Sequence, residues 1–259
     1  MGDVAKVVAE LAEAGVQIVR INYSDLHGVI RGKDVPIGWA EHVLEDGAGF
    51  CEAIMTIDNH HNVVAGFEHG FQDIAAKGDL ATGVVLPWDP TVATFLADLY
   101  RMGTGEPFDV DPRGALRQVV AGYADLGLHP VVGPELEFYL SEPDGSRYPN
   151  KFSSVYRVGD HADPRGVLRR LLDGCVGLKL DVFAANHEFG NGQFEINLRH
   201  SDALDAADRA FRFKAAIKDL AMREGLVATF MGKPYADMEG SGFHIHLSLR
   251  DAADRFFKS

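Results

Sequence analysis

Three segments in the second half of the chain alternate polar and apolar residues, and this alternation constrains the fold more than any other feature. The segments cover residues 131–140, 193–199 and 241–249. Because successive side chains of a β-strand point to opposite faces, each segment predicts a strand with one apolar and one polar face. Apolar residues at helical spacing over residues 205–224 predict a helix as well. The expected fold class is therefore α+β.

The polar faces of the three expected strands carry side chains that commonly bind metals or act in catalysis. Any antiparallel sheet with one solvated face alternates in this way, and for a single strand we favour that simpler interpretation. Solvated faces usually carry Lys, Thr and Ser beside Glu, whereas these faces collect Glu, Gln, Asn and His with one Arg. Three such strands together favour a functional site. The polar residues are Glu135 and Glu137, then Gln193, Glu195, Asn197 and Arg199, and finally His244, His246 and Ser248.

The segment from His187 to Glu195 suggests how two of the acidic residues meet. If Asn191 and Gly192 form a two-residue hairpin turn, Glu188 lies directly opposite Glu195. Two carboxylates ~5 Å apart repel by roughly 3 kcal/mol at an effective dielectric constant near 20. Such a pair persists if it shares a proton, faces water or holds a cation. The hairpin is a hypothesis, since a looser glycine-rich loop would also bring the two residues near each other.

Four carboxylates and an imidazole suit Mg²⁺ or Mn²⁺ better than zinc, which prefers several Cys or His ligands. Mg²⁺ held by few protein ligands usually also binds phosphate oxygens, so the expected reaction class is phosphoryl transfer. The sequence contains neither a P-loop motif nor the Gly-x-Gly-x-x-Gly motif of dinucleotide-binding folds.

The first part of the chain predicts a smaller domain. Apolar residues at positions 4, 7, 8 and 11 recur at helical spacing, and extended segments are expected at residues 16–23 and 29–37. A turn-rich connector follows, so we predict domains at residues 1–103 and 104–259. Asp111 followed by Pro112 predicts the start of a helix, with Asp111 as its N-cap.

Composition narrows the range of partners. The chain has 38 acidic and 25 basic residues, a net charge of −13, which argues against nucleic acid or an anionic membrane as the main partner. No apolar run approaches the ~18 residues of a membrane span, and the first residues lack the apolar core of a signal peptide. Two cysteines form no disulfide framework, so a cytoplasmic location is expected.

Four motifs, in matching order and spacing, resemble the glutamine synthetase family. The first domain is similar to that family's β-grasp N-terminal domain. The resemblance implies that the second domain is part of a catalytic half-barrel, a curved antiparallel sheet with flanking helices, and that the chain ends partway through it. The motifs lie at residues 133–138, 187–195, 228–234 and 240–246, and the N-terminal similarity runs from residue 21 through Lys33 to Trp88.

The resemblance also implies a reaction and its participants. ATP phosphorylates the γ-carboxylate of glutamate, and ammonia or an amine then displaces the phosphate, with Mg²⁺ or Mn²⁺ bound at two or more sites. Family members assemble into homo-oligomeric rings. The motif positions imply a metal nearer glutamate at Glu137, Glu188 and Glu195, a metal on the ATP phosphates at Glu135 and His244, nucleotide contacts at His246 and Ser248, and glutamate contact through the backbone of Gly240.

Departures from the family pattern favour an amine as the acceptor. The Asp-Gly-Ser-Ser segment, whose Asp helps to bind ammonium in the family, has no counterpart, and residues 50–54 stand in its place. Glu239 replaces the usual Asn before Gly240, Asn186 replaces a His, and Gly232 replaces a Pro. These changes resemble the branch that ligates glutamate to polyamines or other amines.

Two other functions stay open on the sequence alone. A non-catalytic relative could keep the fold for assembly or regulation, and because of the early chain end we expect little catalysis from these 259 residues on their own. A metal-dependent hydrolase is the weaker alternative, because the expected nucleotide positions His246 and Ser248 argue against it.

Overall fold

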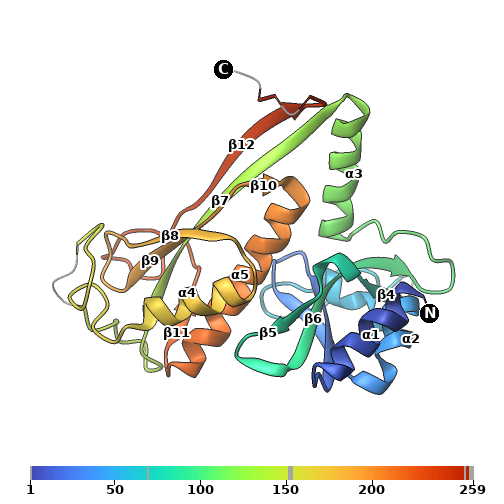
Figure 1. Cartoon of the computed structure of the whole chain (residues 1–259), viewed down its shortest axis with the longest axis horizontal. Coiled ribbons are helices and arrows are strands. Elements are labelled where there is room, and N and C mark those ends of the chain that lie inside the picture. The colour runs from blue at the N-terminus through green and yellow to red at the C-terminus, as the bar shows by residue number, and fades with distance from the viewer. Residues whose placement is uncertain (1, 69, 151–153, 254, 257–259) are drawn as a thin grey trace. The chain divides into compact units, whose positions relative to one another are not determined.

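The computed structural model describes residues 2–68, 70–150, 154–253 and 255–256, and the chain divides into two compact units, Met1–Ala121 and Gly122–Ser259. Both units mix helices and strands, which confirms the α+β fold class (Figure 1). Helix α3 (Pro112–Asp125) runs across the division. The domain ranges 1–103 and 104–259 stay a prediction.

The first unit contains a mixed sheet with strand order β2-β1-β6-β4-β3, and β5 pairs with β6. Strands β1 and β2 form an antiparallel hairpin, while β1 and β6 run parallel, the arrangement of a β-grasp fold. The helices and 3₁₀ turns of this unit before α3 are α1 (Asp3–Glu13), η1 (Ile37–Trp39), α2 (Ala40–Asp46), η2 (Glu52–Thr56) and η3 (Leu80–Thr82). Its strands are β1 (Ile18–Ser24), β2 (Ile30–Pro36), β3 (Ala48–Cys51), β4 (Asp73–Gly78), β5 (Val84–Leu86) and β6 (Asp89–Arg101).

The core of the first unit lies between this sheet and its helices. Val19, Ile21 and Tyr23 alternate along β1 and are buried, and the apolar face of α1 packs against the same core. The predicted helix and the two predicted extended segments are therefore confirmed, with Gly15 in the left-handed conformation (φ 87°) that ends α1.

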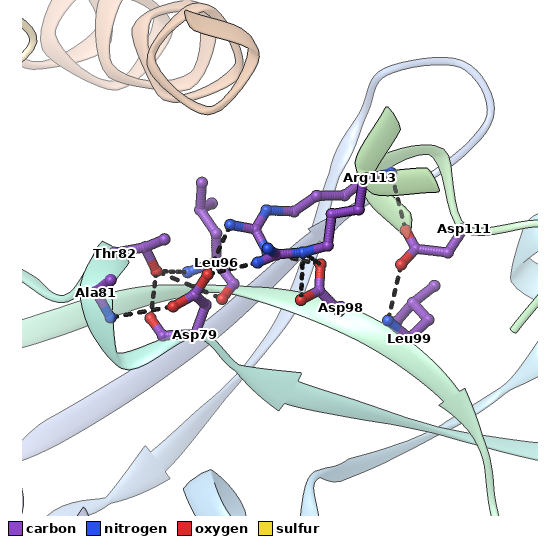
Figure 2. A network of polar contacts seen from close by, with 9 residues as sticks. Asp79, Ala81, Thr82, Leu96, Asp98, Leu99, Asp111 and Arg113 are labelled. Atoms are coloured by element: carbon purple, nitrogen blue, oxygen red, sulfur yellow. Dashed lines mark hydrogen bonds and ion pairs between the residues drawn. The ribbon is translucent and has the colours of Figure 1, made fainter. Parts of the chain in front are cut away.

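A network of polar contacts fixes the start of α3 in the first unit (Figure 2). The Asp111 carboxylate accepts hydrogen bonds from the backbone N of Arg113 at 3.0 Å and of Leu99 at 2.9 Å, which confirms Asp111 as the N-cap. The Arg113 guanidinium donates to Asp98 at 2.6 Å and to Asp79 at 2.9 Å. Burial raises the pKa of Asp111. The first turn of α3 is thus tied to β6 and to the segment before η3.

The second unit is built around one long strand, β7 (Leu128–Ser141), with antiparallel partners on both sides. Strands β9 and β10 pair along one side of β7, and β11 and β12 pair along the other. The remaining elements are α4 (Val167–Gly177), β8 (Val182–His187), β9 (Gln193–Leu198), β10 (Ser201–Asp202), α5 (Ala203–Arg223), β11 (Val227–Thr229) and β12 (Phe243–Asp251).

The apolar face of this sheet is covered by helices. Helix α5 packs against β7, and α4 packs against α5 (Figure 1). Phe138 on β7 contacts Phe194 on β9 and Phe213 on α5, each with ring centroids 6.2 Å apart. Because Glu135 and Glu137 alternate with these buried residues, they lie on the opposite face.

Among the described residues, no helix combines the length and the apolar character that crossing a membrane requires.

Candidate functional site

Strand β7 brings the acidic residues into register with the strands on either side. Glu135 pairs with His244 on β12 and with Asn197 on β9, and Glu137 pairs with Glu195 on β9. The three segments predicted from alternation are all strands of one sheet, with their polar residues on a shared face. Groups that lie far apart in the sequence are therefore cross-strand neighbours.

Three of the predicted ligands converge closely enough to hold one metal ion. One ligand atom from each of Glu135, Glu195 and His244 lies within 4.8 Å of the others. Nδ1 of His244 is 3.6 Å from Oε2 of Glu135, and Nε2 of His246 is 3.2 Å from the same oxygen. This group joins members of the two ligand sets that the resemblance implies, since Glu195 was expected at one metal and Glu135 with His244 at the other.

The electrostatics of the group fit a divalent cation. Burial, and after it the nearby carboxylates of Glu135 and Glu188, raise the pKa of Glu195 to about 6, although a hydrogen bond from Asn186 acts to lower it. Neighbouring carboxylates oppose each other's ionisation, and a cation bound between them offsets this repulsion. Carboxylate oxygens with one imidazole are a donor set suited to Mg²⁺ or Mn²⁺.

Gly242 keeps space open beside the same group. A Cβ atom at this position would lie 2.9 Å from Oε1 of Glu137 and 2.9 Å from Nε2 of His244. Any side chain at residue 242 would therefore intrude between a carboxylate and an imidazole. The residues present fit a metal site on this observation as well as on their chemistry.

The predicted two-residue hairpin turn is wrong, because the register of β8 and β9 differs from the predicted one by two residues. Strand β8 places His187 opposite Phe194 and Asn186 opposite Glu195, and residues 188–192 form a longer loop. An Asn-Gly hairpin turn of type I′ needs a positive φ at both central residues, whereas of Asn191 and Gly192 only Gly192 (φ 80°) has one. The carbonyl of Gly192 instead accepts a hydrogen bond from Leu140 N at 2.8 Å.

A shift by two residues preserves the face on which each side chain lies. Glu188 is buried and accepts a hydrogen bond from Asn186 Nδ2 at 2.7 Å, and its carboxylate acts on the pKa of Glu195. The looser loop therefore brings Glu188 and Glu195 together, as the alternative to the hairpin predicted.

Glu137 is held by a side chain to which the sequence assigned no role. Nε2 of Gln193 donates to Oε2 of Glu137 at 2.8 Å and to the carbonyl of Gly240 at 2.9 Å. Gln193 was expected on the polar face, but its partners lie 56 and 47 residues away, and no local pattern identifies them.

The remaining predicted residues lie along β12 and just before it. His246 is exposed beside Glu135, Ser248 pairs in register with Val131 further along the strand, and Gly240 lies in the segment that precedes β12. Their roles toward nucleotide and glutamate stay predictions.

Comparisons with known proteins place this geometry in a family. A family model described as glutamine synthetase, catalytic domain, matches residues 109–259. A glutamine synthetase of Pyrococcus horikoshii is 33% identical over 251 residues, covering 94% of this chain and 53% of that protein. A glutamate–isopropylamine ligase of a Pseudomonas species is 33% identical over 272 residues, covering 96% of this chain and 57% of that protein.

Solved structures agree in both units. The structure of a GmaS/ADP complex matches with a TM-score of 0.86 and 35% identity, covering 96% of this chain and 57% of that one. A crystal structure of a glutamine synthase homologue matches with a TM-score of 0.81 and 25% identity, over 92% and 56% of the two chains. The chain spans about half the length of the curated relatives it matches. Since the family model covers more than half of the chain, and includes every strand of the acidic site, the chain belongs to the glutamine synthetase family.

Proposed function

We propose that this chain carries part of the active site of a ligase that joins ammonia or an amine to the γ-carboxylate of glutamate in an ATP-dependent reaction. The observation that carries the proposal is the convergence of Glu135, Glu195 and His244 from three strands of one sheet. The reaction class follows from the relatives, whose names are glutamine synthetase and glutamate–isopropylamine ligase.

In the proposed reaction, the γ-phosphoryl group of ATP passes to a γ-carboxylate oxygen of glutamate and gives γ-glutamyl phosphate with ADP. The amine nitrogen then forms a bond to the carbonyl carbon of the γ-carboxyl group, the bond from this carbon to the phosphate oxygen breaks, and the nitrogen loses a proton. Mg²⁺ or Mn²⁺ held at the acidic face would neutralise charge on the phosphate oxygens.

The residues of this chain would bind and orient the participants. Glu135, Glu195 and His244 would hold a divalent metal, and Glu137 and Glu188 would complete the acidic face around it. The strand positions of His246 and Ser248, on the same face of β12 as His244, support nucleotide contacts there. The backbone of Gly240 would contact glutamate.

We propose an amine other than ammonia as the acceptor. The sequence departures at residues 50–54 and at Glu239 support this choice. The similarity to an isopropylamine ligase and to GmaS supports it too, although glutamine synthetases match at comparable identity. The assembly of the whole protein into a ring-shaped homo-oligomer is part of the same proposal.

A pair of measurements tests the proposal. Calorimetric titration of Mn²⁺ into the 259-residue chain should give binding that is lost in Glu135→Gln and in Glu195→Gln. Binding no tighter than that of scattered surface carboxylates would indicate a non-catalytic relative. Phosphate release from ATP with glutamate and a panel of amines, with mass spectrometry of the γ-glutamyl product, then identifies the acceptor. ATP hydrolysis that gives no amide would favour the hydrolase instead.

A further inference from the structure

Gln193 is the first residue of β9, and its side-chain amide makes three hydrogen bonds. Oε1 accepts from the backbone N of Gly190 at 2.9 Å, while Nε2 donates to Glu137 Oε2 and to the Gly240 carbonyl. Only 1% of the residue is exposed, so water does not compete for these contacts. The amide orientation is fixed by its partners, because the flipped amide would face two acceptors with its own oxygen.

Each of the three contacts reaches a different part of the candidate site. Gly190 belongs to the loop that carries Glu188, Glu137 is on β7, and Gly240 precedes β12. One buried amide therefore joins the loop, the carboxylate of Glu137, which is a predicted metal ligand, and the segment expected to contact glutamate.

The contact with Glu137 also sets the direction of its carboxylate. With Oε2 held by Gln193, Oε1 lies on the side of Gly242, next to the space that separates it from the His244 ring. The amide thus holds one carboxylate oxygen and leaves the other on the side of the His244 ring.

A neighbouring side chain holds the same segment at an adjacent residue. Tyr139 is opposite Gln193 in the register of β7 and β9, and its Oη donates to the carbonyl of Glu239 at 2.8 Å. The carbonyls of residues 239 and 240 are therefore both tied to the sheet, one by a phenol and one by the amide. Of these two side chains, the amide alone also holds a predicted metal ligand.

We propose that Gln193 is a positioning residue that couples metal binding at the acidic face to glutamate binding at the Gly240 segment. The inference rests on the proposed function, because it takes glutamate as the ligand of that segment. A metal that holds Glu137 in place also holds the Gln193 amide, and the same amide fixes the Gly240 carbonyl. The metal and glutamate therefore each favour the arrangement that the other requires. Coupling of this kind is reciprocal and typically amounts to about 5- to 150-fold in affinity.

Mn²⁺ titrations with and without saturating glutamate measure the coupling directly. In the wild-type chain, glutamate should tighten Mn²⁺ binding by at least about fivefold. In Gln193→Met, Mn²⁺ affinity should fall about 10- to 100-fold, as for other partners that orient metal ligands, and glutamate should no longer change it. Gln118→Met, on the exposed surface of α3, should retain both the affinity and the coupling.

The variant Tyr139→Phe tests whether loosening the segment at residues 239–240 is enough to explain the effects, or whether the Gln193 amide itself is required. It releases the Glu239 carbonyl without touching Glu137, so glutamate affinity should fall while Mn²⁺ affinity in the absence of glutamate stays within about twofold. Should Gln193→Met fail to fold by circular dichroism, Gln193→Glu keeps the shape and the acceptor for Gly190, and it should lose the coupling at pH 8.

The outcomes separate this inference from the proposed function. Wild-type Mn²⁺ binding that glutamate does not alter, or a Gln193 variant that retains the coupling, overturns the role of Gln193 and leaves the metal site standing. Absence of Mn²⁺ binding in the wild-type chain contradicts the proposed function itself.

Discussion

Glu137 and Glu195 occupy directly opposite positions on the neighbouring strands β7 and β9. Like charges in such positions destabilise a sheet, and burial adds to the cost. The amide of Gln193 donates to Glu137, and burial together with the carboxylates of Glu135 and Glu188 raises the pKa of Glu195. This crowding of carboxylates is the physical reason to expect a cation, and the first two predictions measure its effect on Glu195.

Glu195→Gln should stabilise the metal-free chain at pH 8 and weaken Mn²⁺ binding. A neutral amide removes the ionisation that burial and the Glu135 carboxylate oppose, a gain of about 1 kcal/mol once solvent screening at this partly exposed site is included. Scanning calorimetry should show a midpoint a few degrees higher, and titration should show Mn²⁺ affinity at least about tenfold lower. Glu45→Gln, on the exposed surface of α2, is the matched control and should change neither quantity. Destabilisation by Glu195→Gln would mean that the carboxylate is satisfied in the metal-free fold.

The stability of the metal-free chain should fall as the pH rises from 4.5 to 6.5. The pKa of Glu195 is raised from 4.5 to about 6, so the folded state holds this proton more tightly than the unfolded state. The contribution is fully present below pH 4.5 and is lost as the pH rises through 6. Urea unfolding at intervals across this window measures it, and Glu195→Gln should flatten the slope. An unchanged slope in that variant would assign the pH dependence to other groups.

Asp111→Ala should destabilise the first unit by about 2 kcal/mol. The change removes the N-cap of α3 and leaves the buried backbone N of Leu99 without its acceptor. Urea unfolding followed by circular dichroism gives the value. Asp109→Ala, which removes an exposed ion pair with Arg101, should cost less than about 1 kcal/mol. Equal effects of the two substitutions would contradict the capping role.

Gly190→Ala should destabilise the second unit and weaken Mn²⁺ binding together. A Cβ at this position would clash with the Tyr139 hydroxyl and lie 2.9 Å from Oε1 of Gln193, so the amide that holds Glu137 has to move. The same substitution at Gly122 meets nothing within 4 Å and lies inside α3, where it should stabilise by about 1 kcal/mol. Thermal unfolding and Mn²⁺ titration of both variants test this contrast. Retention of full Mn²⁺ affinity by Gly190→Ala would show that the amide tolerates displacement.

The strands of the site could be predicted from the sequence because the relevant signal is local. Alternation with a period of two identified β7, β9 and β12 and assigned Glu135, Glu195 and His244 to their polar faces. The N-cap at Asp111 was equally local, since a helix start depends on the residues that immediately follow it.

The features that the sequence did not predict depend on backbone dihedral angles or on long-range contacts. The register of the strands around Asn191 differs by two residues from the prediction, because a residue pair common in hairpin turns does not fix the φ angle. The role of Gln193 depends on Glu137 and Gly240, which only the folded sheet brings to it. The grouping of Glu195 with Glu135 and His244 likewise follows from the pairing order of strands rather than from motif spacing.

The position of β7 between β9 and β12 limits how the gene can change in length. Inserting or deleting one codon between Glu135 and Phe138 would exchange the two faces of the strand on one side of the change. Acidic side chains would then point into the apolar interior, or a phenylalanine would point toward the acidic group. Codons gained or lost in the loop at residues 188–192 would leave that frame intact. Length variation among functional descendants of this sequence should therefore be confined to loops and be absent from this stretch.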